Sequence, residues 1–282
     1  MNDQSAPRFS IIVAVFNGVK TLQQCIDSVA QQSFANKELI IIDGSSKDGT
    51  VDLLKVNREK ISYWISEPDH GIYNAWNKGL VQAKGEWICF LGADDYFWDS
   101  QVLEKMSEQL EKLPSSIRVA YGQVMIVNEC GESLYLIGEH WQKVKERFKQ
   151  FMCISHQGVM HRRSLFELHG KFDESFRISG DYELLLRELK TNDAYFFQDG
   201  IVTAMRVGGV SWLVANSLPV MLENMRAAKM HSQRLPLIFW LIAMAKAYIR
   251  FMLWCVLGER VTSKARDFYR RVKGLSPYCT RT

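Results

Sequence analysis

Acidic side chains recur in the first third of the chain, each directly after a short apolar run. Carboxylates repel a diphosphate directly, but a divalent cation held between them binds phosphate oxygens, and oxygen ligands suit Mg²⁺ or Mn²⁺. Such a cation also neutralises the charge that develops on a departing diphosphate. Taken one at a time, these positions are more often explained by turn and capping chemistry, where Asp is favoured. The residues are Asp43, then Glu67 and Asp69, and the adjacent pair Asp94 and Asp95.

The elements around these carboxylates alternate between strands and helices. Continuous apolar, β-branched runs indicate strands that are buried on both faces, and stripes at helical spacing indicate helices between them. This alternation predicts a parallel sheet with right-handed crossovers, whose ligands bind beyond the carboxyl ends of the strands. We therefore expect the acidic residues to meet at one sheet edge. The expected strands are 9–16, 38–42, 61–66 and 87–91, and the expected helices are 21–32, a short one from Val51, and 72–83 with Ile72 in its buried stripe.

The pattern becomes mixed after residue 115. Asp181 opens a clear helical run there, at a helix N-terminus where the dipole favours an acid whatever its function. We expect strands at 119–127 and 134–137, helices at 163–169 and 181–190, and a mixed strand region at 195–206.

Composition fits one large α/β domain with an appended segment, because the chain has 282 residues and 47% of them are apolar. No charged and apolar leader precedes the first strand, so we expect no secretory signal. The six cysteines lack metal-ligand spacing and are expected to be buried free thiols in a reducing compartment.

The formal charge of +4 hides an asymmetry between the body and the tail. Residues 231–282 carry ten Lys and Arg against two Asp and Glu, whereas residues 1–230 carry a net charge of −4. The stretch 235–257 is apolar but contains Lys246 and Arg250, which share one helical face. This pattern is typical of a helix that lies in a membrane interface beside a basic flank. The alternative is a helix packed on the main domain with a solvated tail.

Three runs of residues, in this order and spacing, resemble glycosyltransferase family 2. They are SIIVAVFN, ELIIIDGSSKDGT and SEPDHGIYNAWNKGLVQAKGEWICFLGADD, and the resemblance is strong over 9–98. It continues more weakly through HQGVMHRRSLFELHGKFDESFRISGDYELLLRE. The resemblance implies a GT-A fold, with a Rossmann-like, mostly parallel sheet flanked by helices. We expect the catalytic domain at 1–215 and a C-terminal helical, membrane-associating extension at 216–282.

The resemblance also implies roles for matched residues. Asp43 would bind the nucleobase, with Phe16 near the base ring. Asp94 and Asp95 would form the metal and diphosphate site, with Asp95 as the more direct ligand. Asp181 would be the general base that deprotonates the acceptor hydroxyl.

Other positions are less defined by the resemblance. Asp69 either contacts the nucleotide or shapes its loop, and Arg206 is a candidate for cationic help with the diphosphate. His156 is either a site residue or a structural one. Two positions depart from many relatives: Gly92 replaces an acidic or amide residue, and Trp76 replaces an arginine that contacts the diphosphate.

The expected activity is inverting transfer of a sugar, from a UDP-sugar by family resemblance, to a hydroxyl of a glycan or lipid-linked acceptor, as in bacterial surface polysaccharide synthesis. Mn²⁺ or Mg²⁺ is the expected cofactor. We expect a cytoplasmic protein on the inner face of the cell membrane that binds no nucleic acid. The alternatives are a sugar-nucleotide nucleotidyltransferase, whose Gly-rich basic loop is not matched by residues 17–20, and a non-catalytic nucleotide-sugar-binding protein. Nucleic-acid binding by the basic tail is a third.

Overall fold

A computed structural model describes residues 6–209, 213–231 and 237–272. Within these ranges, one nine-stranded sheet has the order β3-β2-β1-β4-β8-β6-β9-β5, and β7 pairs with β6. Its strands are β1 (Phe9–Val15), β2 (Lys37–Asp43), β3 (Tyr63–Ser66), β4 (Trp87–Gly92), β5 (Tyr96–Phe97), β6 (Val119–Val127), β7 (Ser133–Ile137), β8 (Val159–Arg162) and β9 (Tyr195–Arg206).

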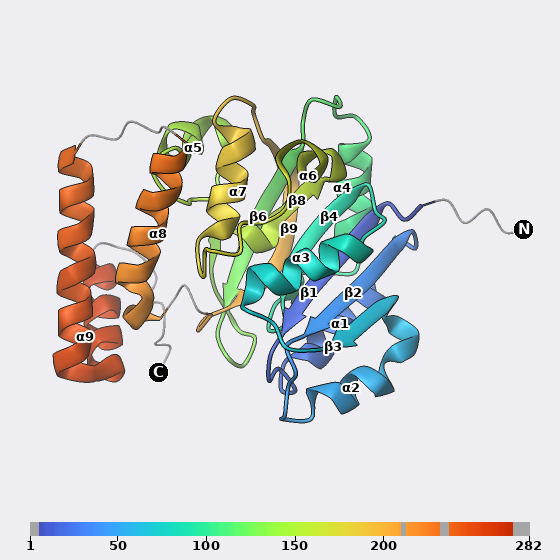
Figure 1. Cartoon of the computed structure of the whole chain (residues 1–282), viewed down its shortest axis with the longest axis horizontal. Coiled ribbons are helices and arrows are strands. Elements are labelled where there is room, and N and C mark those ends of the chain that lie inside the picture. The colour runs from blue at the N-terminus through green and yellow to red at the C-terminus, as the bar shows by residue number, and fades with distance from the viewer. Residues whose placement is uncertain (1–5, 210–212, 232–236, 273–282) are drawn as a thin grey trace, which may run out of the picture.

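Helices cover both faces of this sheet (Figure 1). They are α1 (Leu22–Ala30), α2 (Thr50–Val56), α3 (Ile72–Gln82), α4 (Val102–Leu110), α5 (Trp141–Phe148), α6 (Arg163–His169), α7 (Gly180–Leu189), α8 (Ser217–Met230) and α9 (Leu237–Val272).

The predicted mostly parallel α/β sheet is confirmed. Strands β1, β2, β3, β4, β6 and β9 run in one direction, and β5, β7 and β8 run in the other. The antiparallel strands all lie beyond β4, so the first four strands form the parallel half that the sequence pattern predicts.

The continuous apolar strands serve two cores at once. Ile12 of β1 packs in the cluster that contains the buried faces of α3 and α7. Its neighbours Ile11 and Val13 pack in the cluster on the other face, with α1 and α4. Because successive side chains of a strand point to opposite faces, both must be apolar when both faces are covered.

The sheet register brings the acidic strand ends together at one edge. Val15 at the end of β1 pairs with Asp43 on one side, and Ala14 pairs with Gly92 on the other. Asp43 in turn pairs with Ser66 at the end of β3. The edge predicted from the sequence is therefore the one that the fold builds.

Two expectations about burial were wrong. Ile72 is 39% exposed, whereas Tyr73 is buried at 3%, so the buried stripe of α3 runs through Tyr73 and Trp76. The described cysteines are free, but Cys130 and Cys255 are exposed rather than buried. Tyr73 is three residues before Trp76, which is the helical spacing that places both side chains on one face.

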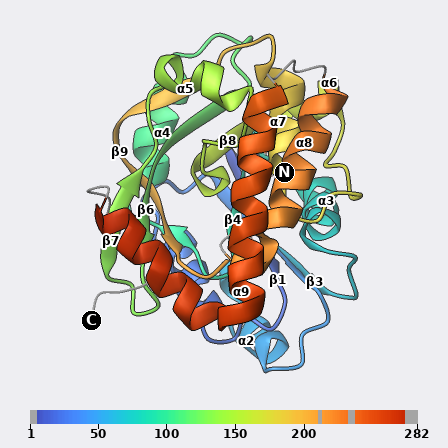
Figure 2. The ribbon, with the colours of Figure 1, turned by 90° about the vertical axis from the view of Figure 1, so that its left-hand side faces the viewer.

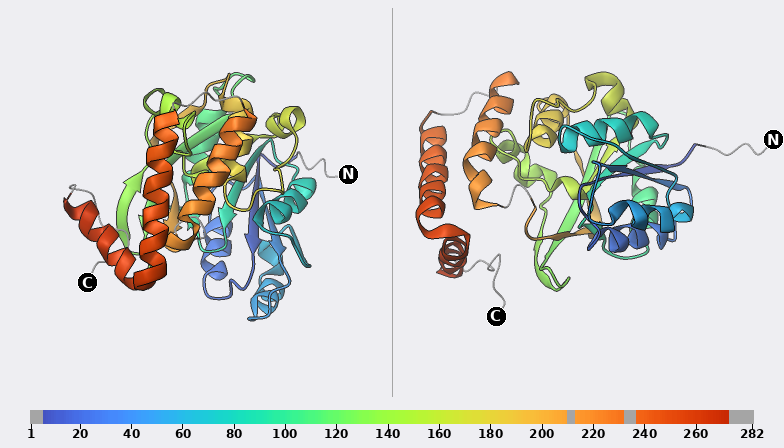
Figure 3. Two further views of the ribbon diagram at one scale, coloured as in Figure 1. Left: turned by 60° about the vertical axis from the view of Figure 1, so that its left-hand side comes forward. Right: turned by 60° about the horizontal axis from the view of Figure 1, so that its bottom comes forward.

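The tail forms the long helix α9, which α8 separates from α7 (Figures 1 and 3). α9 bends at Gly258, whose φ of 75° interrupts the helix (Figure 2). By length and composition, Trp240–Gly258 is apolar enough to cross a membrane, and little of it is buried. Of the expected tail and cysteine positions, Leu235, Pro236, Lys273 and Cys279 lie outside the described residues.

Candidate active site

Asp43 is a fully buried carboxylate at the end of β2. It accepts hydrogen bonds from the backbone amide of Ser46 at 3.0 Å and the Ser66 hydroxyl at 2.6 Å, and also from the Ser46 hydroxyl. These bonds fix the loop that follows β2 and join it to β3. A base N–H can reach this carboxylate only if one of the two hydroxyls turns aside, because the carboxylate is covered.

Phe16 presents an exposed aromatic face directly beside this loop. Its side chain is 67% exposed, although it follows a strand that is almost wholly buried. A Cβ placed on Gly44 would lie 3.4 Å from the Phe16 ring and 2.5 Å from the Asp69 carboxylate. The structure therefore brings Phe16, Gly44 and Asp69 together, and a side chain at position 44 would require the Asp69 carboxylate to move. An exposed ring here suits stacking with a base.

The loop after β1 is held against the loop after β2 by backbone amides. The amides of Asn17 and Gly18 donate to the hydroxyls of Ser46 and Thr50, at 2.7 and 3.0 Å. Phe16 is thereby positioned by the same loop that Asp43 organises. Asp69 also has a local role, because it accepts from the backbone amide of Gly71 at 2.9 Å.

Asp94 and Asp95 share a small space beside β4. A Cβ on Gly92 would lie 2.8 Å from an Asp94 carboxylate oxygen and 2.6 Å from one of Asp95. Burial raises the pKa of both carboxyls, and the charge of Asp94 raises the pKa of Asp95 further. The glycine that departs from many relatives is thus what leaves room for both side chains.

This pair fits a divalent cation. Asp95 is buried and Asp94 is half-buried, and two such close carboxylates destabilise each other as anions, a cost that a cation between them removes. The donor set is oxygen only, which suits Mg²⁺ or Mn²⁺ with phosphate oxygens and waters as further ligands. Among the described residues, no group of three or more His, Cys, Asp or Glu side chains is arranged to hold a metal ion.

Arg206 lies against the same pair, at the end of β9. Its backbone amide donates to Asp95 at 3.1 Å, and its Nε donates to the backbone carbonyl of Asp94 at 3.1 Å. The rest of the guanidinium donates to the Glu129 carbonyl at 2.6 Å and to Gln24. Arg206 thus holds the loop of the carboxylate pair in place. Its positive charge partly offsets the rise that burial causes in the pKa of both carboxyls.

Asp181 lies in the first turn of α7 and is half-buried. It accepts from the backbone amide of Tyr182 at 2.8 Å and lies 3.3 Å from the Tyr73 hydroxyl. Burial raises the pKa of Asp181 to about 6. A Cβ on Gly180 would lie 2.8 Å from the Tyr73 ring, so glycine is required there because Tyr73 packs against the backbone. That packing explains the glycine.

The carboxylate of Glu183, the other acid in this turn, is engaged in hydrogen bonds within the core. It is 2% exposed and accepts from Arg187 Nε at 3.0 Å and pairs with His231 at 2.7 Å. These bonds leave Asp181 as the acid of this turn that is suited to proton transfer.

Trp76 and His156 lie in the aromatic core behind the site. Their rings are 5.0 Å apart, and both side chains are buried. Burial lowers the pKa of His156 well below its usual range, and none of the described residues hydrogen-bonds to its ring nitrogens. The side chain that replaces the expected arginine therefore belongs to the core.

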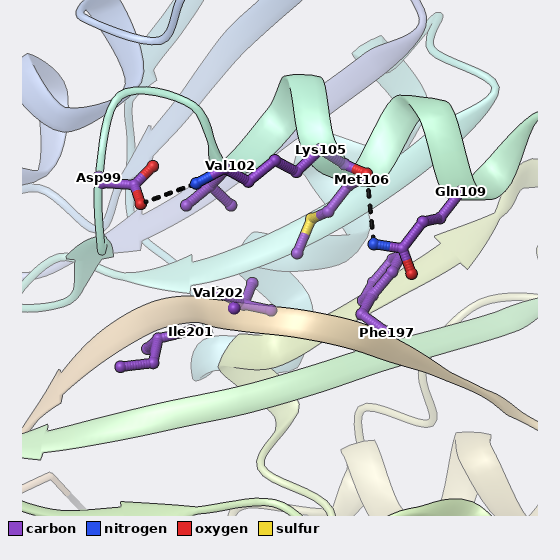
Figure 4. Close-up of a pocket in the computed structure, with 9 residues that line it drawn as sticks. Asp99, Val102, Lys105, Met106, Gln109, Phe197, Ile201 and Val202 are labelled. Carbon is purple, nitrogen blue, oxygen red and sulfur yellow. Dashed lines mark hydrogen bonds and ion pairs between the residues drawn. The ribbon is translucent and has the colours of Figure 1, made fainter.

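A separate small cavity lies between α4 and β9 (Figure 4). It has a volume of about 20 Å³ and is lined by Val102, Met106, Phe197 and Val202 among others. None of these residues belongs to the carboxylate edge.

Comparisons with known proteins converge on one family. The family described as Glycosyl transferase family 2 matches residues 10–168. A PGL/p-HBAD biosynthesis glycosyltransferase of Mycobacterium bovis is 30% identical over 187 residues, which cover 65% of this chain and 70% of that protein. An uncharacterized glycosyltransferase of Rickettsia typhi is 28% identical over 203 residues, which cover 70% and 63%.

Two solved structures share the fold. S. aureus TarS 1-349 in complex with UDP has a TM-score of 0.61 at 18% identity, and the match covers 94% of this chain and 77% of that one. A mannosyltransferase from Pyrobaculum calidifontis, in complex with GDP-Man and Mn²⁺, has a TM-score of 0.61 at 16% identity, covering 93% and 75%.

Proposed function

Because the chain belongs to glycosyltransferase family 2 and has the GT-A fold, we propose that it transfers a sugar, with inversion, from a nucleotide-diphosphate sugar to an acceptor hydroxyl. One observation carries this proposal. The exposed Phe16 and the Asp94–Asp95 pair lie at the carboxyl edge of the parallel strands, where such folds bind ligands. Asp181 comes from a later segment of the chain and supplies a separate carboxylate.

The proposed reaction is a single displacement. The acceptor oxygen forms a bond to the anomeric carbon while the bond from that carbon to the diphosphate oxygen breaks. Asp181 takes the proton of the acceptor hydroxyl as the new bond forms. A base with a pKa of about 6 is ionised at neutral pH and close enough to the operating pH for efficient transfer.

The carboxylate pair serves the other side of the displacement. Asp94 and Asp95 would hold Mn²⁺ or Mg²⁺, which neutralises charge on the leaving nucleoside diphosphate. Arg206 keeps the loop of this pair in place through its bonds to both residues. Phe16 would carry the base, and Asp43 would organise the loop against which the base lies.

We infer UDP as the nucleotide and a glycan or lipid-linked hydroxyl as the acceptor. The UDP complex of TarS and the biosynthetic role named for the mycobacterial relative support this choice, although a GDP-sugar complex exists in the same fold. Incubation with a panel of UDP- and GDP-sugars and Mn²⁺ should release UDP from at least one UDP-sugar. Release of GDP alone would contradict the nucleotide assignment.

A second assay, with a nucleoside triphosphate and a sugar phosphate as substrates, distinguishes the enzyme-class alternative. A sugar-nucleotide nucleotidyltransferase would form pyrophosphate from a nucleoside triphosphate and a sugar phosphate. We expect no pyrophosphate under those conditions. A non-catalytic binder would bind UDP but turn over no donor even with acceptor extracts.

We also propose that α9 holds the enzyme on the inner face of the cell membrane. Its large apolar side chains are exposed, and Lys246 and Arg250 suit anionic headgroups. The exposed apolar residues include Leu241, Ile249, Met252, Leu253 and Val256.

Replacing three of these apolar residues tests the membrane proposal. Leu241, Met252 and Val256 share one helical face, and changing all three to Ser should abolish sedimentation with anionic vesicles. A truncation after His231 should do the same while retaining α8. The matched control is Val56→Ser, which changes an apolar residue that is 83% exposed on α2. Unchanged sedimentation of the triple variant would rule out lipid contact by this face.

A further inference from the structure

Helix α8 meets the segment that leads into α7 through one carboxylate. Glu223 accepts from three successive backbone amides, those of Arg177, Ile178 and Ser179, at 2.9, 2.8 and 2.8 Å. Hydrogen bonds from backbone amides to a carboxylate are charge-assisted and stronger than neutral ones. These three residues immediately precede α7, so Glu223 fixes the approach to the turn that contains Asp181.

Two further side chains of this region reinforce the contact, one on the same segment and one on α7 itself. Arg226 donates to the Ser175 carbonyl at 3.2 Å and to its hydroxyl at 2.6 Å, and its guanidinium lies 4.3 Å from the Phe176 ring. His231 pairs with Glu183 inside α7. α8 therefore contacts the segment through Glu223 and Arg226, and it lies beyond the part of the chain that matches the family model.

The opposite side of the segment is held by α3. The Tyr73 hydroxyl donates to the Ile178 carbonyl at 2.6 Å and lies 3.3 Å from the Asp181 carboxylate. Ile178 is thus bonded through its amide to Glu223 and through its carbonyl to Tyr73. With both groups of this residue fixed, the backbone two residues further on has little freedom.

We propose that Glu223 is a positioning residue for catalysis, which holds the 177–179 backbone so that Asp181 meets the acceptor hydroxyl. This inference rests on the proposed role of Asp181 as the base. It makes α8 part of the catalytic machinery, although sequence patterns assign it to the tail. α8 also packs against α9. The helix that we propose to lie on the membrane is therefore connected to Asp181 through α8.

Glu223 also acts on Asp181 through its charge. The groups that face Asp181 are Tyr73 from α3, Glu223 from α8, and the backbone amide of Tyr182 on its own helix. Burial is the main cause of the raised pKa of Asp181, and the negative charge of Glu223 adds to it, whereas hydrogen bonds from the Tyr182 amide, the Tyr73 hydroxyl and its own backbone oppose it. Removing that charge should therefore lower the pKa of Asp181.

Glu223→Gln in the full chain tests both effects. The glutamine removes the charge and turns one acceptor oxygen into a donor that faces a backbone N–H. We expect kcat to fall roughly 10-fold or more, since a misplacement of ~1 Å costs up to about 10²-fold. The acid limb of the kcat–pH profile should move to lower pH, while KM for the donor changes little. Glu108→Gln, an exposed acid of α4, is the matched control and should leave both unchanged.

The outcomes separate this inference from the function on which it rests. If Asp181→Asn greatly lowers turnover but Glu223→Gln leaves kcat and the acid limb as in the wild type, the positioning role is wrong. If Asp181→Asn has no effect, the assignment of the base is wrong whatever Glu223 does. If Glu223→Gln does not fold, Glu223→Asp decides the question: a lowered kcat with the limb in place supports the inference, and a wild-type kcat overturns it.

Discussion

Asp181→Asn is expected to lower turnover by about 10²–10⁴-fold, the usual contribution of a positioned general base. Asparagine keeps the size of the side chain and can still accept from the Tyr182 amide and the Tyr73 hydroxyl. It cannot accept the proton of the acceptor. Because that interaction is made in the transition state, KM for the donor should stay nearly unchanged.

The pH profiles of the wild type and of the Asp181→Asn variant give an independent check. The carboxyl of Asp181 must be ionised to act, and its pKa is raised to about 6. The turnover rate of the wild type should therefore be at its full value well above pH 6 and should be lost as the pH falls through about 6. The asparagine variant should lack this limb, because it has no group that titrates there.

Glu183→Gln serves as the neighbouring comparison. Glu183 is buried and paired with Arg187 and His231, so its loss should lower the melting temperature more than the chemical rate per folded molecule. If Asp181→Asn retains wild-type turnover with a true acceptor, the base is another residue. If donor affinity collapses instead, Asp181 belongs to the donor side.

The parallel half of the fold was predictable because its strands are covered on both faces. Runs such as 39–42 are apolar at every position, which few other structures require. An acidic residue that directly follows such a strand must lie at the edge of the sheet where the carboxyl ends of the strands meet. Asp43 and the Asp94–Asp95 pair were placed correctly at that edge from this reasoning alone, while their chemical roles stay predictions.

The partners of these residues were not predictable in the same way. Tyr73 and Glu223 lie 108 and 42 positions from Asp181 in the chain, and nothing in their local sequence indicates the contact. Glu223 lies in a weakly amphipathic helix that the sequence pattern assigns to the C-terminal extension. Its three hydrogen bonds exist only because α8 packs against α7. The boundary proposed at residue 215 therefore separates α8 from the segment that it holds.

The Asp94–Asp95 pair has a local signal in the sequence, but its geometry depends on Gly92. A Cβ there would overlap one oxygen of each carboxylate, at 2.8 and 2.6 Å. The family resemblance implies an acidic or amide residue at this position, so sequence reasoning alone treats the glycine as a lost ligand. The structure instead indicates that it creates the space the two carboxylates share.

UDP is therefore expected to bind about 5- to 150-fold more tightly with Mn²⁺ than with EDTA, the range typical of coupled binding at neighbouring sites. Asp95→Ala should remove this difference, because the diphosphate then meets a site that holds its cation poorly. Gly92→Ala keeps both carboxylates but forces them apart, so it should reduce the difference as well. Calorimetric titration of UDP with and without Mn²⁺ measures each case, with Asp52→Asn, an exposed acid of α2, as the control.

Equal UDP affinity of the wild type in Mn²⁺ and in EDTA would show that no cation bridges this pair and the diphosphate. Loss of the difference in Asp95→Ala but not in Gly92→Ala would leave the cation in place and refute only the role of the glycine.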